Sequence, residues 1–210
     1  NVCQPAVTVV TNISLDHTKQ LGDTTAKIAA EKGGIIKHGV PVVLGTLDDS
    51  AHDVLLEIAR QHGARVIDAR RDFEAVYRAP HEVDAHAAAG EVDFAAGSGE
   101  QRFTLNAAPL RMLGQHQAAN AAVALATALE LRRQGWLIST DAMRAGLAEA
   151  TLPGRIEVVG RRPTVVLDVA HNVASVEALV ESLCESFAAT ERVLVFAASK
   201  DKDAPGMLRV

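Results

Sequence analysis

Four short polar segments of the sequence combine residue types that can do chemistry, and the first of them spans residues 11 to 18. This segment follows an apolar run and places Asp16 directly before His17. A carboxylate and an imidazole at the end of a buried strand can together hold a divalent cation. The same two side chains also suit a loop in which they only make hydrogen bonds, and the residue types leave both interpretations open.

The second segment runs from Glu31 to Lys37 and contains two adjacent glycines. Lys32 lies near the end of a predicted helix, where the helix dipole favours a cation. Taken alone, this position indicates a helix-end lysine without a chemical role. The two glycines permit a close backbone approach or a left-handed turn.

The third and fourth segments lie close together in the last third of the chain. Arg155 stands beside a predicted linker, where a guanidinium can grip a phosphate through two parallel hydrogen bonds or remain at the surface. Asp168 and His171 stand where a predicted strand gives way to a helix, a position that suits binding of a ribose hydroxyl or an amino group. Helix capping by Asn172 or Ser175 is the other interpretation of this last segment.

Alternating strands and helices are predicted to position the first two segments. Apolar, β-branched runs indicate strands at residues 6–10, 41–44 and 65–68, and polar capping residues indicate helices at about 24–31 and 48–62. Asp23 is the predicted cap of the first helix. Strand–helix alternation of this kind predicts a parallel α/β sheet.

The pattern changes after residue 70 and again after Leu152-Pro153-Gly154, the best linker in the sequence. Short strands at 73–77, 92–94 and 103–105 predict an antiparallel appendage, followed by helices at about 116–133 and 141–150. A second α/β unit is predicted beyond the linker, with strands at 158–159, 164–167 and 193–196 and a helix at 173–187. We therefore expect two domains, residues 1–151 and residues 152–210.

Composition narrows the class of protein. The 210 residues are 48% apolar and carry a net charge of −5, which argues against nucleic acid as a partner because phosphate binding favours a basic face. No apolar run approaches the ~18 residues of a membrane span, so we expect no membrane partner. The two cysteines, Cys3 and Cys184, form no CxxC pair and predict a reduced, cytoplasmic protein.

The four segments together resemble those of the folylpolyglutamate synthases in the Mur ligase superfamily. The matching phrases, in the family's order, are TNISLDHT, LGDT, IAAEKGGIIK, LGQHQAANAAVALA, LPGRIE, LDVAHN and FAASKDKD. The resemblance implies part of the ATP-binding Mur ligase central domain over residues 1–151. It also implies the start of a Rossmann-like glutamate ligase domain over residues 152–210.

The resemblance implies an ATP-dependent ligase that adds L-glutamate to the γ-carboxyl of a folate or tetrahydrofolate. ATP phosphorylates that carboxyl, and the amino group of glutamate then attacks the acyl phosphate. Catalysis of this kind consists mostly of positioning and charge neutralisation, with Mg²⁺ at the phosphates. Some bacterial relatives also make dihydrofolate, and the sequence leaves that second activity open. We expect a monomer.

Site roles also follow from the resemblance. His17 matches a magnesium ligand, and Lys32 matches a lysine that the family carbamylates to serve a second Mg²⁺. The remaining matches are Asn120 for adenine, Arg155 for phosphate, Asp168 and His171 for the nucleotide and the incoming amino acid, and Ser199 and Lys200 for the glutamate site.

Two departures from the family pattern stand out. Val173 replaces a usual proline, and the 210 residues contain no GxxxxGK[ST] phosphate-binding loop. We expect that loop, and a glutamate ligand of the second Mg²⁺, to lie upstream of Asn1. The alternatives that remain are a Mur-type ligase of cell-wall precursors and a non-catalytic fragment.

Overall fold

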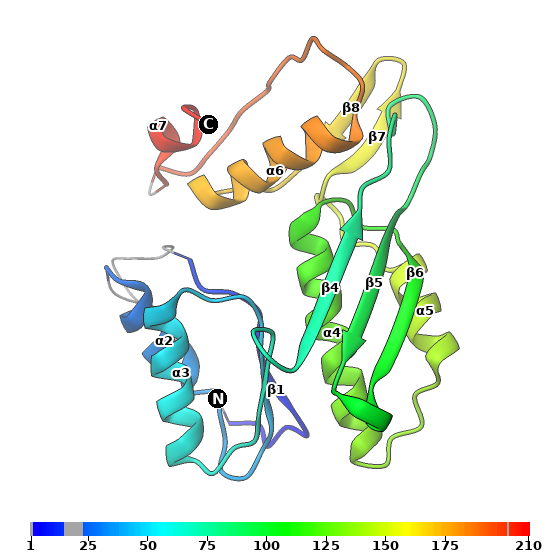
Figure 1. Cartoon of the computed structure of the whole chain (residues 1–210). Helices are drawn as coiled ribbons and strands as arrows, with labels where there is room; N and C mark the ends of the chain where they lie inside the picture. The colour runs from blue at the N-terminus through cyan, green and yellow to red at the C-terminus, as the bar shows by residue number, and fades with distance from the viewer. Residues whose placement is uncertain (1, 15–22, 201) are drawn as a thin grey trace. The chain divides into compact units, whose positions relative to one another are not determined.

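The computed structural model describes residues 2–14, 23–200 and 202–210 (Figure 1). The chain forms two compact units. Unit 1 contains residues up to Ala75, Phe94–Thr104 and Ala119–Met143, and unit 2 contains Val76–Asp93, Leu105–Ala118 and Arg144–Val210. Across the described part of the chain, no helix is both long and apolar enough to span a membrane.

Unit 1 contains the predicted parallel sheet. Its strands are β1 (Thr8–Val10), β2 (Val42–Leu44) and β3 (Val66–Asp68), in the order β1-β2-β3. Both pairings are parallel, with Val42 opposite Thr8 on one side and Val66 on the other. Every residue of the central strand β2 is buried. The parallel sheet expected from the strand–helix alternation is confirmed.

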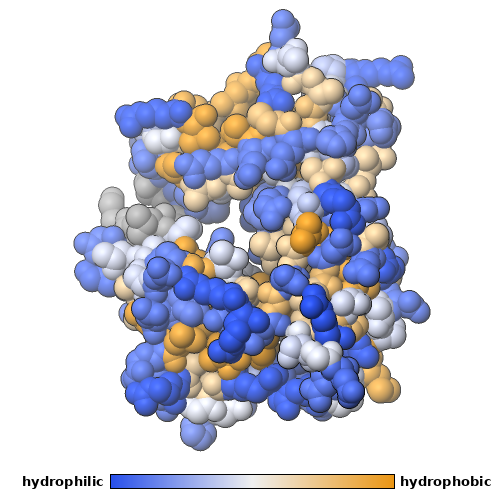
Figure 2. Space-filling model, in the orientation of Figure 1, coloured by the Kyte–Doolittle hydropathy of each residue, from blue (hydrophilic) through white to orange (hydrophobic). Residues whose placement is uncertain are grey.

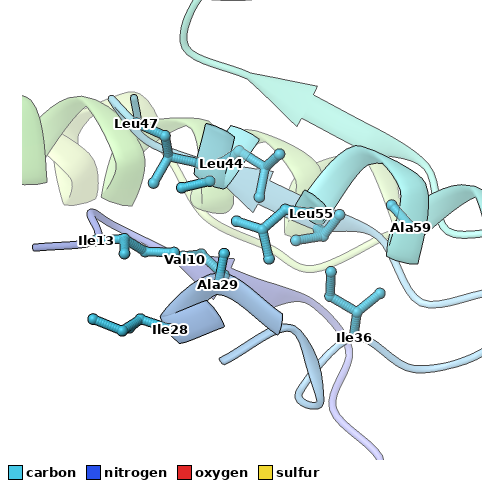
Figure 3. Packing of buried hydrophobic residues seen from close by; sticks show 11 residues of the cluster. Val10, Ile13, Ile28, Ala29, Ile36, Leu44, Leu47, Leu55 and Ala59 are labelled. Atoms are coloured by element: carbon cyan, nitrogen blue, oxygen red, sulfur yellow. The ribbon is translucent and has the colours of Figure 1, made fainter. Parts of the chain in front are cut away.

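Helices α2 (Thr25–Gly33) and α3 (Asp49–Gln61) pack with this sheet around one aliphatic core (Figure 3). Close packing explains the glycine at position 33, because a Cβ there would lie 2.4 Å from Ile58 Cδ1 of α3. The last turn of α2, which carries Lys32, therefore lies directly against α3. Burial of the aliphatic side chains of this core contributes about 1.5–3 kcal/mol for each large residue.

Capping residues begin both helices, with one correction to the prediction. Of the three candidate caps in the sequence, Asp48, Asp49 and Ser50, it is Asp48 that caps α3, its carboxylate accepting from the Ala51 N–H at 3.1 Å. Thr24, and not Asp23, caps α2 by accepting from the Lys27 N–H at 3.3 Å. Asp23 instead forms an ion pair with the Lys27 side chain at 2.8 Å, one turn along the helix. Side chains four residues apart on a helix are neighbours, so the Asp23 carboxylate can pair with the Lys27 ammonium.

The predicted appendage is a three-stranded antiparallel sheet in the order β4-β5-β6. Its strands are longer than the sequence predicted: β4 is Phe73–Arg78, β5 is Gly90–Ala96 and β6 is Phe103–Leu110. A short 3-10 helix, Gly99–Gln101, precedes β6. Three of the chain's few aromatic rings pack together at one end of this sheet, with centroids 6.1 Å apart for Phe73 and Phe94 and 6.3 Å apart for Phe94 and Phe103.

Helices α4 (Gln115–Arg133) and α5 (Thr140–Glu149) follow this sheet, close to their predicted bounds. Beyond the linker, β7 (Glu157–Arg161) and β8 (Thr164–Leu167) pair antiparallel. Helices α6 (Val173–Ser186) and α7 (Ala204–Met207) complete unit 2. Asn172 and Ser175 both cap α6, each accepting a backbone N–H of the other, so the two proposed caps act together.

The strand predicted at residues 193–196 is wrong. This segment is irregular, and Val193, Leu194 and Val195 are 95%, 70% and 92% exposed. Figure 2 shows hydrophobic residues over the region where Figure 1 draws the segment that follows α6. An apolar run becomes a strand only when a neighbouring backbone accepts its hydrogen bonds. In the described residues no strand pairs with this run, and its side chains stay at the surface.

Glu130 on α4 is a buried carboxylate in unit 1, and its contribution to stability can be tested. It is 2% exposed and accepts from Arg133 and Gln134 on its own helix and from Arg65 before β3. Burial opposes its ionisation, but these hydrogen bonds outweigh burial and lower the pKa to about 2. Glu57 on α3 has the same spacing to Arg60 and Gln61, but that group is at the surface.

We expect Glu130→Gln to destabilise the fold by about 1–3 kcal/mol near neutral pH, because a neutral amide replaces a buried carboxylate that accepts from two guanidinium groups. The folded pKa of Glu130 lies below its ordinary value of 4.5, so its stabilisation is present above pH 4.5 and is lost as pH falls toward about 2. Urea unfolding between these pH values measures the effect. Glu57→Gln is the matched control and should leave the free energy of unfolding nearly unchanged. Equal effects of the two substitutions would contradict the role of burial.

Candidate active site

The LPGRIE and LDVAHN segments interlock within unit 2. The Val169 N–H donates to the Gly154 carbonyl at 2.9 Å, and the Gly154 N–H donates to the Glu157 carboxylate at 2.8 Å. Gly154 has a φ of +70°, and a Cβ there would lie 2.7 Å from Val169 Cγ1. Only glycine therefore fits both the backbone angle and the space at this position.

Asp168 holds the other side of the same turn. One of its carboxylate oxygens accepts from the Ile156 N–H at 2.9 Å and the other accepts from the Ala170 N–H at 2.7 Å. Ile156 has a φ of +48°, a left-handed conformation that is rare for a β-branched residue. The hydrogen bond that Ile156 donates to Asp168 stabilises that conformation. Since Gly154 and Ile156 are both tied to the 168–169 segment, the backbone of Arg155 between them is fixed.

The structure therefore brings two predicted site residues together, Arg155 and Asp168. Arg155 is half-buried, and the carboxylate of Asp168 is already bonded to backbone N–H groups on both sides. The geometry gives Asp168 a positioning contact with the turn that carries Arg155. Such a contact fixes the backbone that carries the Arg155 side chain without the need for a bound ligand.

His116 is a member of this cluster that the sequence reasoning missed. It is half-buried in the first turn of α4. Burial lowers the pKa of His116 below its ordinary value, Asp168 and Glu181 oppose that shift, and Arg155 adds to it. These charges act on His116 because it lies near them, and the lowered pKa keeps the imidazole neutral near pH 7. The LGQHQAAN phrase contained the signal, but only its asparagine was assigned a role.

Packing against two other elements fixes the start of α4. The Gly114 N–H donates to the Tyr77 hydroxyl at 3.1 Å. A Cβ at Gly114 would lie 2.2 Å from Ser182 Oγ of α6, so α4 and α6 approach closely there. This close approach places His116 beside the interlocked segments.

The other predicted residues of unit 2 lie at the surface. The backbone N–H of His171 donates to Ser175 Oγ, and its Nδ1 lies 3.0 Å from the Val169 carbonyl oxygen. The ring is exposed just before α6. Ser199 and Lys200 are exposed in the irregular segment between α6 and α7.

The remaining predicted residues belong to unit 1. Lys32 is exposed in the last turn of α2, and Asn120 is exposed on α4. His17 and its neighbours Asp16 and Thr18 lie outside the described residues. The described residues contain no group of three or more His, Cys, Asp or Glu side chains that could hold a metal ion. Of the predicted metal ligands, the structure therefore describes Lys32 alone.

Comparison with known proteins places these segments in a family. The model of the Mur ligase middle domain matches residues 1–128, and the model of the Mur ligase glutamate ligase domain matches residues 154–209. The chain therefore belongs to the Mur ligase family. Its relatives within that family are named folylpolyglutamate synthases, as the motifs predicted.

Two relatives show the extent of the likeness. The dihydrofolate synthase/folylpolyglutamate synthase of Bacillus subtilis is 35% identical over 210 residues, covering 100% of this chain and 47% of the relative. The folylpolyglutamate synthase of Lacticaseibacillus casei is 33% identical over 195 residues, covering 89% of this chain and 42% of the relative. The chain thus spans about half the length of the curated relatives it matches.

Solved structures agree on the fold. An FPGS–AMPPCP–folate complex superposes with a TM-score of 0.80 at 29% identity, covering 92% of this chain and 45% of that one. Folylpolyglutamate synthase from Thermotoga maritima superposes with a TM-score of 0.77 at 31% identity, covering 99% of this chain and 45% of that one. The predicted fold class, a parallel α/β sheet with an antiparallel appendage and the start of a second α/β domain, is confirmed.

Proposed function

We propose that the protein is an ATP-dependent ligase that adds L-glutamate to the γ-carboxyl of a folate, the activity of a tetrahydrofolylpolyglutamate synthase. The observation that carries the proposal is the interlocked turn that fixes Arg155 beside Asp168. The names of the relatives, and the AMPPCP and folate of a similar solved structure, support it. An arginine on a fixed backbone suits an enzyme whose catalysis consists of holding phosphate oxygens.

The proposed domains follow the motifs. Residues 1–151 form part of the ATP-binding central domain, and residues 152–210 form the start of the glutamate ligase domain. The matched ranges of the two family models support this boundary. The exposed thiols of Cys3 and Cys184, both free, suit a reducing cytoplasm. We propose that the enzyme acts there as a monomer.

The proposed reaction has two steps. An oxygen of the folate γ-carboxylate attacks the γ-phosphorus of ATP, ADP leaves, and an acyl phosphate forms. The amine nitrogen of glutamate then attacks the acyl carbon, phosphate leaves with the bonding electrons, and the nitrogen loses a proton. Mg²⁺, when bound, neutralises charge on the phosphates. Arg155 neutralises phosphate charge from the protein side.

Other residues bind and orient the reactants in this proposal. Asn120 contacts the adenine, and Asp168 holds the Arg155 turn at the nucleotide. His171 faces the incoming amino acid, with Ser199 and Lys200 near its carboxylates. His17 and Lys32, the latter as a carbamate, are the proposed metal ligands. Neutral His116 beside Arg155 adds no positive charge that would compete for the phosphate.

Dihydropteroate is a candidate second substrate, because several relatives are named both dihydrofolate synthase and folylpolyglutamate synthase. The relatives from Bacillus subtilis, Mycobacterium tuberculosis and Escherichia coli are each named dihydrofolate synthase/folylpolyglutamate synthase. Dihydropteroate presents a carboxyl group to the same acyl-phosphate chemistry. We include dihydrofolate synthesis as the second proposed activity.

ADP release by the full-length gene product tests both proposals. We expect release that requires glutamate together with tetrahydrofolate, and in a separate assay glutamate together with dihydropteroate. The 210 residues expressed alone should release no ADP above blank, because they contain no GxxxxGK[ST] loop to cradle the β- and γ-phosphates. Activity with a nucleotide-linked cell-wall precursor and none with either pterin acid would assign the protein to the Mur-type alternative instead.

A further inference from the structure

A cavity of about 460 Å³ lies within unit 2, beside the turn that carries Arg155. Four stretches of the chain and Arg161 line it, and it is partly open to solvent. The stretches are residues 83–88, residues 111–113, the linker residues 150–153 and residues 155–158. A volume of this size accommodates a small organic molecule.

The wall of the cavity is apolar in part, with polar and apolar side chains contributing about equally to it. Val83, Leu113 and Ile156 are 3%, 6% and 4% exposed and belong to the core cluster of unit 2. Met112, Leu152, Pro153 and Val158 extend the same wall. A ligand that fills the cavity would therefore place a hydrocarbon chain or ring against these side chains.

Three arginines and one glutamate supply the charged groups of the lining: Arg111, Arg155, Arg161 and Glu157. Three positive charges and one negative charge give the lining a net charge of +2. The Glu157 carboxylate is occupied by the Gly154 N–H and forms no ion pair with these arginines among the described residues. The cavity thus has an uncompensated positive charge.

The guanidinium groups also have unused donors. Among the residues that the structure describes, the side chains of Arg111 and Arg155 donate no hydrogen bond and form no ion pair. Arg161 donates to the Val83 carbonyl at 2.6 Å through one nitrogen. A guanidinium carries five N–H donors, so its other donors face no protein acceptor. Arg111 and Arg161 are exposed, and guanidinium groups without a protein acceptor beside apolar side chains can bind carboxylate or phosphate oxygens.

We propose that this cavity binds a small organic anion that carries two negative charges on an apolar body. The apolar side chains of the wall would contact the body of this anion, and Arg111 and Arg161 would bind its acidic groups. Dicarboxylates and phosphate esters share this chemistry. Arg155 also lines the cavity, but neither Arg111 nor Arg161 has a role in the proposed nucleotide contacts, so these two residues distinguish the anion from the nucleotide. The proposal does not depend on the identity of the ligase substrate.

Isothermal titration of the full-length protein tests the proposal with three probes. Phthalate places two carboxylates on a ring, phenyl phosphate places one dianionic phosphate on a ring, and benzamide has the ring without charge. We expect phthalate or phenyl phosphate to bind and benzamide not to bind. The tighter of the two anions identifies the ligand as a dicarboxylate or as a phosphate ester.

Substitutions locate the bound probe. Arg111→Gln and Arg161→Gln should each raise Kd roughly 10- to 100-fold, the value of one or two charge-assisted hydrogen bonds. Arg162→Gln is the matched control, because Arg162 is exposed, adjacent to Arg161 and outside the cavity. It makes the same change in net charge and should leave Kd within about twofold. Circular dichroism checks that each variant folds. If Arg161→Gln fails to fold, Arg111→Gln still tests the proposal.

Three results would overturn the proposal. The first is a failure of both anions to bind. The second is an equal loss in all three Gln variants, which would reflect the general field of the surface. The third is a Kd that Arg155→Ala raises while Arg111→Gln and Arg161→Gln leave it unchanged, which would place the anion among the nucleotide contacts.

Discussion

Arg155→Ala is expected to lower the kcat/KM of the full-length ligase about 10²- to 10³-fold without unfolding it, the usual cost of removing a preorganised charge at a transition state. The fold should survive because the hydrogen bonds of the turn use backbone groups on either side of Arg155. The Gly154 carbonyl and the Ile156 N–H keep their partners when the side chain is removed. Steady-state kinetics with varied ATP, together with thermal unfolding, measure both parts of the prediction.

Two further variants separate charge from geometry. Arg155→Lys should recover only part of the activity, since a point charge does not replace a planar fork of donors. Gly154→Ala should lower activity with Arg155 still present, because its Cβ would collide with Val169 and strain a φ of +70°. The pKa of His116 should rise in Arg155→Ala, because Arg155 helps to lower it. A wild-type kcat/KM in Arg155→Ala would remove Arg155 from the proposed site.

Lys32→Ala is expected to lower the kcat/KM of the full-length ligase by a similar factor, about 10²- to 10³-fold. The proposed carbamate converts a cation into an anion that serves a second Mg²⁺. Acetate or propionate should restore part of the activity, since a small carboxylate can replace the lost carbamate. His17→Ala should cause a comparable loss, which added acid should not restore.

Lys27→Ala is the matched control for Lys32. Lys27 is exposed on the same helix and pairs with Asp23, and its removal should leave kcat/KM within a few-fold of wild type. Mass spectrometry of the gently ionised protein should detect the added CO₂ on Lys32. Full activity of Lys32→Ala, with no carbamate detected, would return Lys32 to the role of a helix-end cation.

Local sequence signals predicted most of the elements because those signals act over a few residues. Asp48 and Asn172 begin α3 and α6 through caps that each need only the following turn. The apolar run of β2 is buried as a whole, as expected for a central parallel strand. Residues 193–196 carry the same kind of run, but without a partner strand they form none. A strand therefore depends on a neighbour that its own sequence does not specify.

In the candidate site, too, local sequence signals predicted the residues, and contacts between distant segments brought them together. The motifs predicted Arg155 and Asp168 as site residues, but the hydrogen bond from the Ile156 N–H to Asp168 joins positions twelve residues apart. His116 reaches the cluster only because α4 packs against α6 at Gly114. Neither contact follows from periodicity or from a cap, since both depend on how distant segments pack.

Glu57 and Glu130 show what the sequence by itself determined and what it left to the tertiary structure. Both glutamates are followed at the same spacing by an arginine and a glutamine, and both make the same helical hydrogen bonds. The sequence determined those local contacts, together with the helices that carry them. Only the tertiary structure buried Glu130 and brought Arg65 to it from the start of β3, because burial and a distant counter-ion arise when elements pack together.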